Sequence, residues 1–226
     1  MTGYPAAIIW DLDGTLIDSA PDLADALNAL LHEHGEATLG ENQVRTMIGN
    51  GVAKLVERGF AAVGEHLQSA QLQKLITRFL QLYTAAATNR TCMYPGVQET
   101  LQFFADAGVQ QGICTNKPEA ISKQILADLS IADYFSVVVG GDTVAEKKPS
   151  PIPLRTCLTA LKTKPGNSML IGDSAVDVET ARALDMPVGI VTHGYSRSPV
   201  ASLGADFLID DLSLLPTLIG ELRAAS

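Results

Sequence analysis

The stretch Ile8-Ile9-Trp10-Asp11-Leu12-Asp13-Gly14-Thr15-Leu16 decides the fold of this chain. The short apolar run at residues 6–10 is typical of a buried strand. It ends in two aspartates on alternate positions, followed by Gly14. Because ligands of parallel α/β sheets bind at the carboxyl ends of the strands, we expect a functional site here.

The two aspartates, Asp11 and Asp13, need a compensating group in a partly dry cleft, because an unpaired desolvated charge is costly. A divalent cation, a protonated carboxyl or a lysine partner would provide it. Asp11 is placed to act as a nucleophile and Asp13 as a proton donor and acceptor. Gly14 permits a sharp turn that aims backbone N–H groups into the cleft. Taken alone, however, Asp-x-Asp-Gly more often forms only a surface turn.

The composition narrows the class of protein. The chain has 226 residues, is 46% hydrophobic and carries a net charge of −9, which fits an α/β protein and argues against nucleic-acid partners and anionic membrane surfaces. Cys92, Cys114 and Cys157 are widely spaced and odd in number, as in reduced cytoplasmic proteins. Without a signal-like N-terminus or a membrane-length apolar run, we expect a cytoplasmic protein with no membrane partner.

The hydrophobic periodicity changes along the chain. Residues 18–88 show helical spacing and no strand pattern, and Thr38 with Glu41 has capping-box spacing. Beyond residue 95, strands alternate with helices, which predicts a parallel sheet with right-handed crossovers. We therefore expect an α/β fold, a doubly wound Rossmann-like core formed by residues 1–17 and 89–226, with a helical cap at 18–88 inserted after the first strand.

Four polar segments follow the predicted strands and should meet at one edge of the sheet. Besides Asp11 and Asp13, they are Thr115-Asn116, Lys147-Lys148-Pro149, and Gly172-Asp173-Ser174 with Asp177. The carboxylates are the hard ligands that Mg²⁺ takes, and the threonine hydroxyl and asparagine amide can hold phosphoryl oxygens. This set suits phosphoryl transfer, where catalysis is largely positioning and electrostatic stabilisation.

Each segment also has an ordinary structural interpretation. Thr115-Asn116 could cap the next helix, Lys147-Lys148-Pro149 could be a solvated loop, and Asp177 could complement a helix dipole. The occurrence of all of them after successive strands favours a shared chemical role.

Together, these motifs resemble the haloacid dehalogenase superfamily, and within it the bacterial phosphoglycolate phosphatases. The matching stretches, in the family's order, are Asp11 to Leu16, Thr115-Asn116-Lys117-Pro118, Lys147 to Leu154, and Gly172-Asp173-Ser174 with Asp177. The resemblance implies that Asp11 forms an aspartyl-phosphate and that Asp13 is the general acid and base. It implies that Thr115, Asn116 and Lys148 bind the phosphoryl group, with Lys148 also steadying the nucleophile.

The same resemblance implies a Mg²⁺ cofactor held by Asp11, Asp173 and the backbone carbonyl of Asp13, with Asp177 close behind. It also implies a cap loop at Gly49-Asn50-Gly51 that faces the substrate. Arg45 and Lys54 flank this loop, and a small carboxylated substrate would need a cation there. The competing interpretation is that they are solvated helix charges.

The leading hypothesis is a Mg²⁺-dependent phosphatase for a small phosphate monoester, foremost 2-phosphoglycolate. One alternative is a phosphatase for a sugar phosphate, or a β-phosphoglucomutase-like phosphomutase, whose cap would need phosphate-binding cations. A more remote alternative is a receiver-like signalling module in which the aspartyl-phosphate is a switch. We expect a small-molecule substrate as the partner, no nucleic acid, and a monomer or homodimer.

Overall fold

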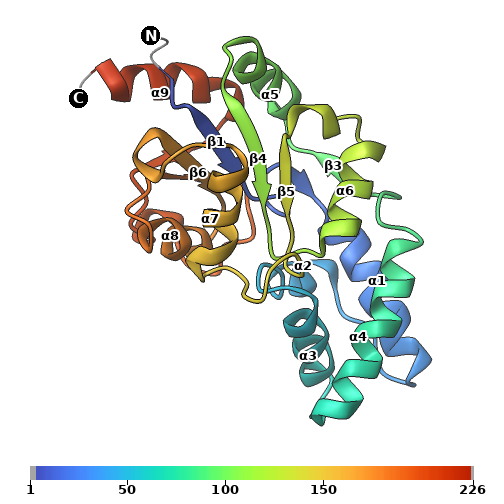
Figure 1. Cartoon of the computed structure of the whole chain (residues 1–226). Coiled ribbons are helices and arrows are strands. Elements are labelled where there is room, and N and C mark those ends of the chain that lie inside the picture. Colours follow the sequence, from blue (N-terminus) through green and yellow to red (C-terminus); the bar gives the residue numbers. More distant parts are fainter. Residues whose placement is uncertain (1–3, 225–226) are drawn as a thin grey trace.

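The computed structural model describes residues 4–224 and contains the predicted parallel sheet (Figure 1). Six parallel strands lie in the order β5-β4-β1-β6-β7-β8. Their bounds are β1 (Ala7–Trp10), β4 (Gln110–Cys114), β5 (Val137–Val139), β6 (Ser168–Gly172), β7 (Val188–Val191) and β8 (Phe207–Ile209). The doubly wound core predicted from the alternating strands and helices is confirmed.

The register of the central strands aligns the three main polar segments. Trp10 of β1 pairs with Ile113 of β4 on one side and with Ile171 of β6 on the other. The chain therefore leaves the sheet at Asp11, Thr115 and Asp173 at nearly the same level. Since parallel strands all end at one edge, this register alone brings the predicted site together.

Side-chain alternation along β1 divides the core between the two faces of the sheet. Ile8 and Trp10 belong to the larger apolar cluster, which includes residues of α5 (Val97–Asp106), α6 (Glu119–Asp128) and α9 (Leu215–Ala224). Ala7 and Ile9 belong to a second cluster with α7 (Pro151–Ala160) and α8 (Ala175–Arg182). With both faces covered, β1 is fully buried, which explains its continuous apolar run.

Four helices form the insertion after β1, at the carboxyl edge of the sheet (Figure 1). They are α1 (Ala20–Glu33), α2 (Glu41–Arg45), α3 (Val52–Ala62) and α4 (Ser69–Thr84). Here α1 packs on the other three helices and α3 also packs on α4. Their apolar stripes meet in residues such as Leu27, Leu30, Phe60 and Phe79. No helix within residues 4–224 is long and apolar enough to cross a membrane.

Two local details differ from the sequence prediction. A short antiparallel ribbon of β2 (Ile17–Asp18) and β3 (Cys92–Met93) joins the insertion to the sheet, and two-residue strands leave no periodicity to recognise. The capping box expected at Thr38 and Glu41 is wrong, because α2 begins after Gly40 without a side-chain cap. The division of the chain into units at residues 18 and 88 remains a prediction.

Candidate active site

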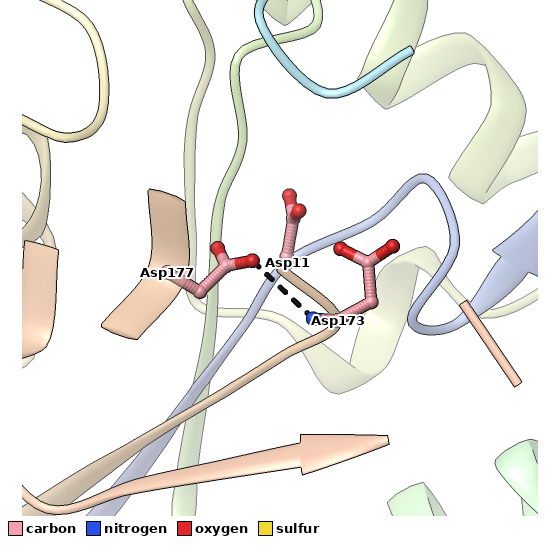
Figure 2. A group of neighbouring side chains, drawn as sticks. All are labelled: Asp11, Asp173 and Asp177. Atoms are coloured by element: carbon pink, nitrogen blue, oxygen red, sulfur yellow. Dashed lines mark hydrogen bonds between the residues drawn. The ribbon is translucent and has the colours of Figure 1, made fainter. Parts of the chain in front are cut away.

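Three buried aspartates converge where β1 and β6 end. Ligand oxygens of Asp11, Asp173 and Asp177 all lie within 4.8 Å of one another. Figure 2 shows their carboxylates around a common space. Asp177 Oδ2 accepts the backbone N–H of Asp173 at 3.3 Å, as well as the N–H and hydroxyl of Ser174. Asp177 is thus fixed by the capping box of α8 and still faces the other two acids.

One lysine partly neutralises this cluster. Lys148 Nζ lies 3.0 Å from Asp11 Oδ1 and 2.6 Å from Asp177 Oδ1, and its side chain is 1% exposed. Burial alone would lower the pKa of Lys148, but the charges of Asp11 and Asp177 outweigh burial and raise it. One ammonium cannot balance three carboxylates, so the ionised cluster retains an excess of negative charge.

Two of the three acids have raised pKa values, to which burial and the neighbouring negative charges both contribute. Burial raises the pKa of Asp11 from 3.8 to about 6, with Lys148 opposing and Asp177 adding to the rise. Burial and the charges of Asp177 and Asp11 also hold the pKa of Asp173 well above its ordinary value. A set of hard oxygen donors that repel one another in this way fits a divalent cation such as Mg²⁺.

The backbone around Asp173 leaves room for nothing larger than glycine. Its Oδ2 accepts the N–H of Tyr195 at 2.6 Å. A Cβ atom on Gly14 or on Gly194 would overlap the Asp173 side chain. Gly14 also has φ of +82°, a left-handed conformation that disfavours other residues. Two glycines and one N–H therefore fix the orientation of this carboxylate.

Asp13 is not part of the acid cluster of Asp11, Asp173 and Asp177 and has its own set of partners. Its Oδ1 accepts from the Ser19 hydroxyl at 2.5 Å and from Lys117 Nζ at 2.9 Å. Lys117 also donates to the hydroxyl of Tyr83, on α4, at 2.7 Å. Lys117 stands inside the quoted Thr115-Asn116-Lys117-Pro118 motif, but nothing in the sequence pattern assigned it a role.

Thr115 and Asn116 both line the pocket that contains Asp11. The Thr115 hydroxyl accepts the N–H of Lys117 at 3.2 Å, which leaves its proton free to donate elsewhere. Asn116 Nδ2 donates to the carbonyls of Gly49 and Lys148, at 3.1 and 3.0 Å. The interpretation of these two residues as helix caps is wrong, because the N-cap of α6 is Pro118 and no side chain caps it.

Of the cap residues expected to face the substrate, only two line the pocket that contains Asp11. Gly49 and Gly51 line a pocket over Asp11, whereas Asn50 accepts hydrogen bonds from Arg58 and Arg197. Arg45 forms a two-pronged ion pair with Asp18 at 2.9 and 3.0 Å. Lys54 is exposed and pairs with Glu57 at 2.6 Å. Neither of the two cap cations expected to face the substrate lines this pocket.

The pocket has a polar floor and an apolar roof. Its floor is formed by Asp11, Asp13, Thr115, Asn116 and Lys117 from the core. On the cap side the larger side chains are Leu23, Ile48, Val52, Leu55 and Tyr83. The arrangement brings a candidate nucleophile, an acid/base candidate and neutral polar groups into one pocket, which suits hydrolysis of a small ester.

The fold and this site define a capped Rossmann-like hydrolase. The model of the haloacid dehalogenase-like hydrolases matches residues 8–191, and the chain belongs to this family. It is 43% identical over 220 residues to a phosphoglycolate phosphatase of Rhodospirillum rubrum, covering 96% of this chain and 91% of that protein. It is 36% identical to one of Caulobacter vibrioides, covering 93% of this chain and 89% of the relative.

Solved structures agree with this assignment. A crystal structure described as a predicted phosphoglycolate phosphatase from Haemophilus somnus 129pt superposes with a TM-score of 0.90 at 30% identity, covering 96% of this chain and 99% of the other. CbbY from Rhodobacter sphaeroides superposes with a TM-score of 0.80 at 22% identity, covering 93% and 96%. At that identity, CbbY supports only the shared fold.

Proposed function

We propose that this hydrolase is a Mg²⁺-dependent phosphatase that cleaves a small phosphate monoester, foremost 2-phosphoglycolate, through an aspartyl-phosphate on Asp11. The observation that carries the proposal is that Asp11 belongs to the acid cluster, contacts Lys148 and lines one pocket together with Asp13. The names of the relatives described above support the same substrate.

The metal would be held by Asp11, Asp173 and the backbone carbonyl of Asp13, with Asp177 close behind. Their donors are hard oxygens, and the excess negative charge of the cluster would attract a divalent cation. When bound, Mg²⁺ supplies positive charge next to the phosphoryl oxygens, so that an anionic ester is not repelled by the acids.

The protein groups would carry out two displacements. In the first, an Asp11 oxygen attacks phosphorus, the bond from phosphorus to the ester oxygen breaks, and Asp13 gives its proton to the leaving alkoxide. In the second, Asp13 takes a proton from water, whose oxygen attacks phosphorus and releases Asp11 with inorganic phosphate. The Thr115 hydroxyl would hold a phosphoryl oxygen throughout, and the Asn116 amide would do so after exchanging one of its two carbonyl acceptors for a phosphoryl oxygen. Lys148 orients Asp11 through their 3.0 Å contact.

The competing functions fit the site less well. A phosphomutase holds a second phosphate against its cap, but the larger cap side chains that line the pocket are Leu23, Ile48, Val52, Leu55 and Tyr83, none of them a cation. A receiver-like module needs an open face beside its phosphorylated aspartate, but here the helical insertion covers Asp11. Asp13 would also have no role in such a switch.

The test is phosphate release with Mg²⁺ from a panel of 2-phosphoglycolate, sugar phosphates and nucleotides. We expect 2-phosphoglycolate to give the highest kcat/KM, and Asp11→Asn to abolish turnover. Asp106→Asn, at an exposed position on α5, is the matched control and should leave activity unchanged. Full activity of Asp11→Asn would refute the mechanism, whereas preference for another ester would refute only the substrate.

A further inference from the structure

Lys117 is a buried cation at the floor of the pocket. Its side chain is 2% exposed, and Nζ lies 2.9 and 3.2 Å from the two carboxylate oxygens of Asp13. The third contact is the Tyr83 hydroxyl at 2.7 Å, and Nζ also lies 4.6 Å from the centre of the Tyr83 ring. The ammonium is therefore held between the acid/base candidate of the core and a helix of the cap.

Among the described residues that line the pocket, Lys117 is the sole cation. Arg45 is engaged by Asp18, and Lys54 is at the surface with Glu57. Lys147 is exposed and lies near Gly51, and it is not part of the pocket lining. A negatively charged leaving group in this pocket would therefore meet Lys117 before any other cation.

We propose that Lys117 recognises the carboxylate of the substrate and thereby selects small phosphate esters that carry a carboxylate one carbon from the ester oxygen. This inference rests on the proposed function and deepens it. Asp13 has to reach the ester oxygen, and Lys117 Nζ is within hydrogen-bond distance of Asp13. A carboxylate separated from that oxygen by one methylene group falls within reach of the same ammonium.

The roof of the pocket supports this choice of substrate. Leu23, Val52 and Leu55 line the pocket on the cap side and offer no hydrogen bond to the hydroxyl groups of a sugar. Burying those hydroxyls without partners would cost affinity. A two-carbon acid leaves only a methylene group for the apolar wall, while its charge goes to Lys117.

Binding would also reposition Asp13. The three contacts of the ammonium are already taken by Asp13 and Tyr83, so a substrate carboxylate must replace Asp13. Asp13 is then free to turn towards the ester oxygen, while Tyr83 keeps Lys117 in place from α4. Recognition of the carboxylate should therefore raise kcat as well as lower KM, because binding energy distant from the reacting bond helps to form the reactive arrangement.

The experiment compares 2-phosphoglycolate with 2-hydroxyethyl phosphate, which replaces the carboxylate by an uncharged CH2OH group. The wild-type enzyme should prefer the carboxylate ester in kcat/KM. Lys117→Met should reduce this preference on the order of 100-fold, the effect of losing a charge-assisted hydrogen bond. Lys54→Met and Lys147→Met test the two competing lysines, and the preference should survive in both.

A binding measurement separates recognition from positioning and from misfolding. The double variant Asp13→Asn with Lys117→Met leaves neither charge at the pocket floor, whereas Asp13→Asn alone keeps the Lys117 ammonium, held by Tyr83 and free of its carboxylate partner. Calorimetry with Mg²⁺ gives the affinity of each variant for each ester. The double variant should bind 2-phosphoglycolate more weakly than Asp13→Asn does and bind 2-hydroxyethyl phosphate equally well. Tyr83→Phe, which keeps both charged residues, should lower the kinetic preference several-fold.

The possible outcomes separate a failure of the role proposed for Lys117 from a failure of the proposed substrate. If the wild-type enzyme prefers 2-phosphoglycolate and Lys117→Met keeps that preference, Lys117 only positions Asp13 and the inference is wrong. A preference lost in Lys54→Met or Lys147→Met instead would assign recognition to that lysine. If the wild-type enzyme does not discriminate between the two esters, the proposed substrate itself fails.

Discussion

Lys148 Nζ lies 2.6 Å from Asp177 Oδ1, and both side chains are almost fully buried. The other oxygen of Asp177 caps α8 by accepting from Ser174. One carboxylate thus joins the start of a helix to the lysine that contacts Asp11. The stability of the fold and the charge of the site depend on the same group.

We expect Asp177→Asn to damage both stability and metal binding. The substitution removes the charge-assisted hydrogen bond to Lys148, which keeps only its 3.0 Å contact with Asp11, and it weakens the cap of α8. We expect the loss to cost about 1–3 kcal/mol of unfolding free energy. Urea unfolding measures this loss, and titration of activity with Mg²⁺ should show a higher metal requirement. Glu179→Gln, at an exposed position on the same helix, is the control and should change neither. A stable Asp177→Asn with a normal Mg²⁺ requirement would contradict this role.

The acid cluster should make the metal-free protein less stable as the pH rises. The folded pKa of Asp11 is about 6, above its ordinary 3.8, so the folded state holds this proton more tightly than the unfolded chain does. Its contribution is fully present below pH 3.8 and is lost as the pH passes through about 6, amounting to roughly 3 kcal/mol. Asp173 shifts in the same direction.

Thermal unfolding in EDTA and in excess Mg²⁺ between pH 5 and 8 tests this dependence. We expect Tm in EDTA to fall across the interval and the gain from Mg²⁺ to grow, because the metal binds the deprotonated carboxylates. Asp11→Asn removes one titrating group and should flatten the EDTA curve. A Tm gain from Mg²⁺ that is the same at pH 5 and pH 8 would argue against these acids as ligands.

Tyr195 has separable roles for its backbone and its side chain. Its hydroxyl donates to Asp18 at 2.7 Å and accepts the N–H groups of Ser19 and Ala20 at 2.9 and 3.1 Å, whereas its backbone N–H holds Asp173. Tyr195→Phe should therefore lower the unfolding free energy by about 1–3 kcal/mol and leave the affinity for Mg²⁺ unchanged. Denaturant unfolding and metal titration measure the two effects.

The matched control for this substitution is Tyr134→Phe, whose hydroxyl donates to the exposed side chain of Gln102. It should cost much less, since water can replace an exposed partner. Weaker Mg²⁺ binding in Tyr195→Phe would show that the side chain, and not only the backbone, positions Asp173.

The sheet and the acid cluster could be predicted because their determinants are local. The apolar run before Asp11 and the polar residues after each strand are visible in the chain, and parallel topology then places them at one edge. The role of Lys117 could not be predicted, because its partners Asp13 and Tyr83 are 104 and 34 residues away. The local sequence around a lysine beside a phosphate motif does not show whether its side chain is solvated or buried.

The cap residue Arg45 shows that nearness in sequence does not predict a role in the site. Arg45 stands near the glycine loop in sequence, which made it a candidate for binding the substrate. In the fold its guanidinium pairs with Asp18 and lies 5.1 Å from the centre of the Tyr195 ring. Sequence spacing predicts which helix carries a charge, but the direction in which that charge points depends on tertiary packing.

Gly14 offers a direct test of how closely the backbone must approach the acid cluster. Gly14 and Gly35 have similar left-handed φ values, +82° and +77°, so replacement by alanine strains both backbones alike. A Cβ at position 35 would meet nothing within 4 Å, whereas one at position 14 would overlap Asp173 Oδ2 and lie 2.9 Å from the Tyr195 ring. Both variants should lose about 1 kcal/mol of unfolding free energy from backbone strain. Gly14→Ala should in addition displace the Asp173 carboxylate, weaken Mg²⁺ binding and lower kcat/KM at least tenfold. Equal Mg²⁺ affinity in the two variants would show that the close approach is not required.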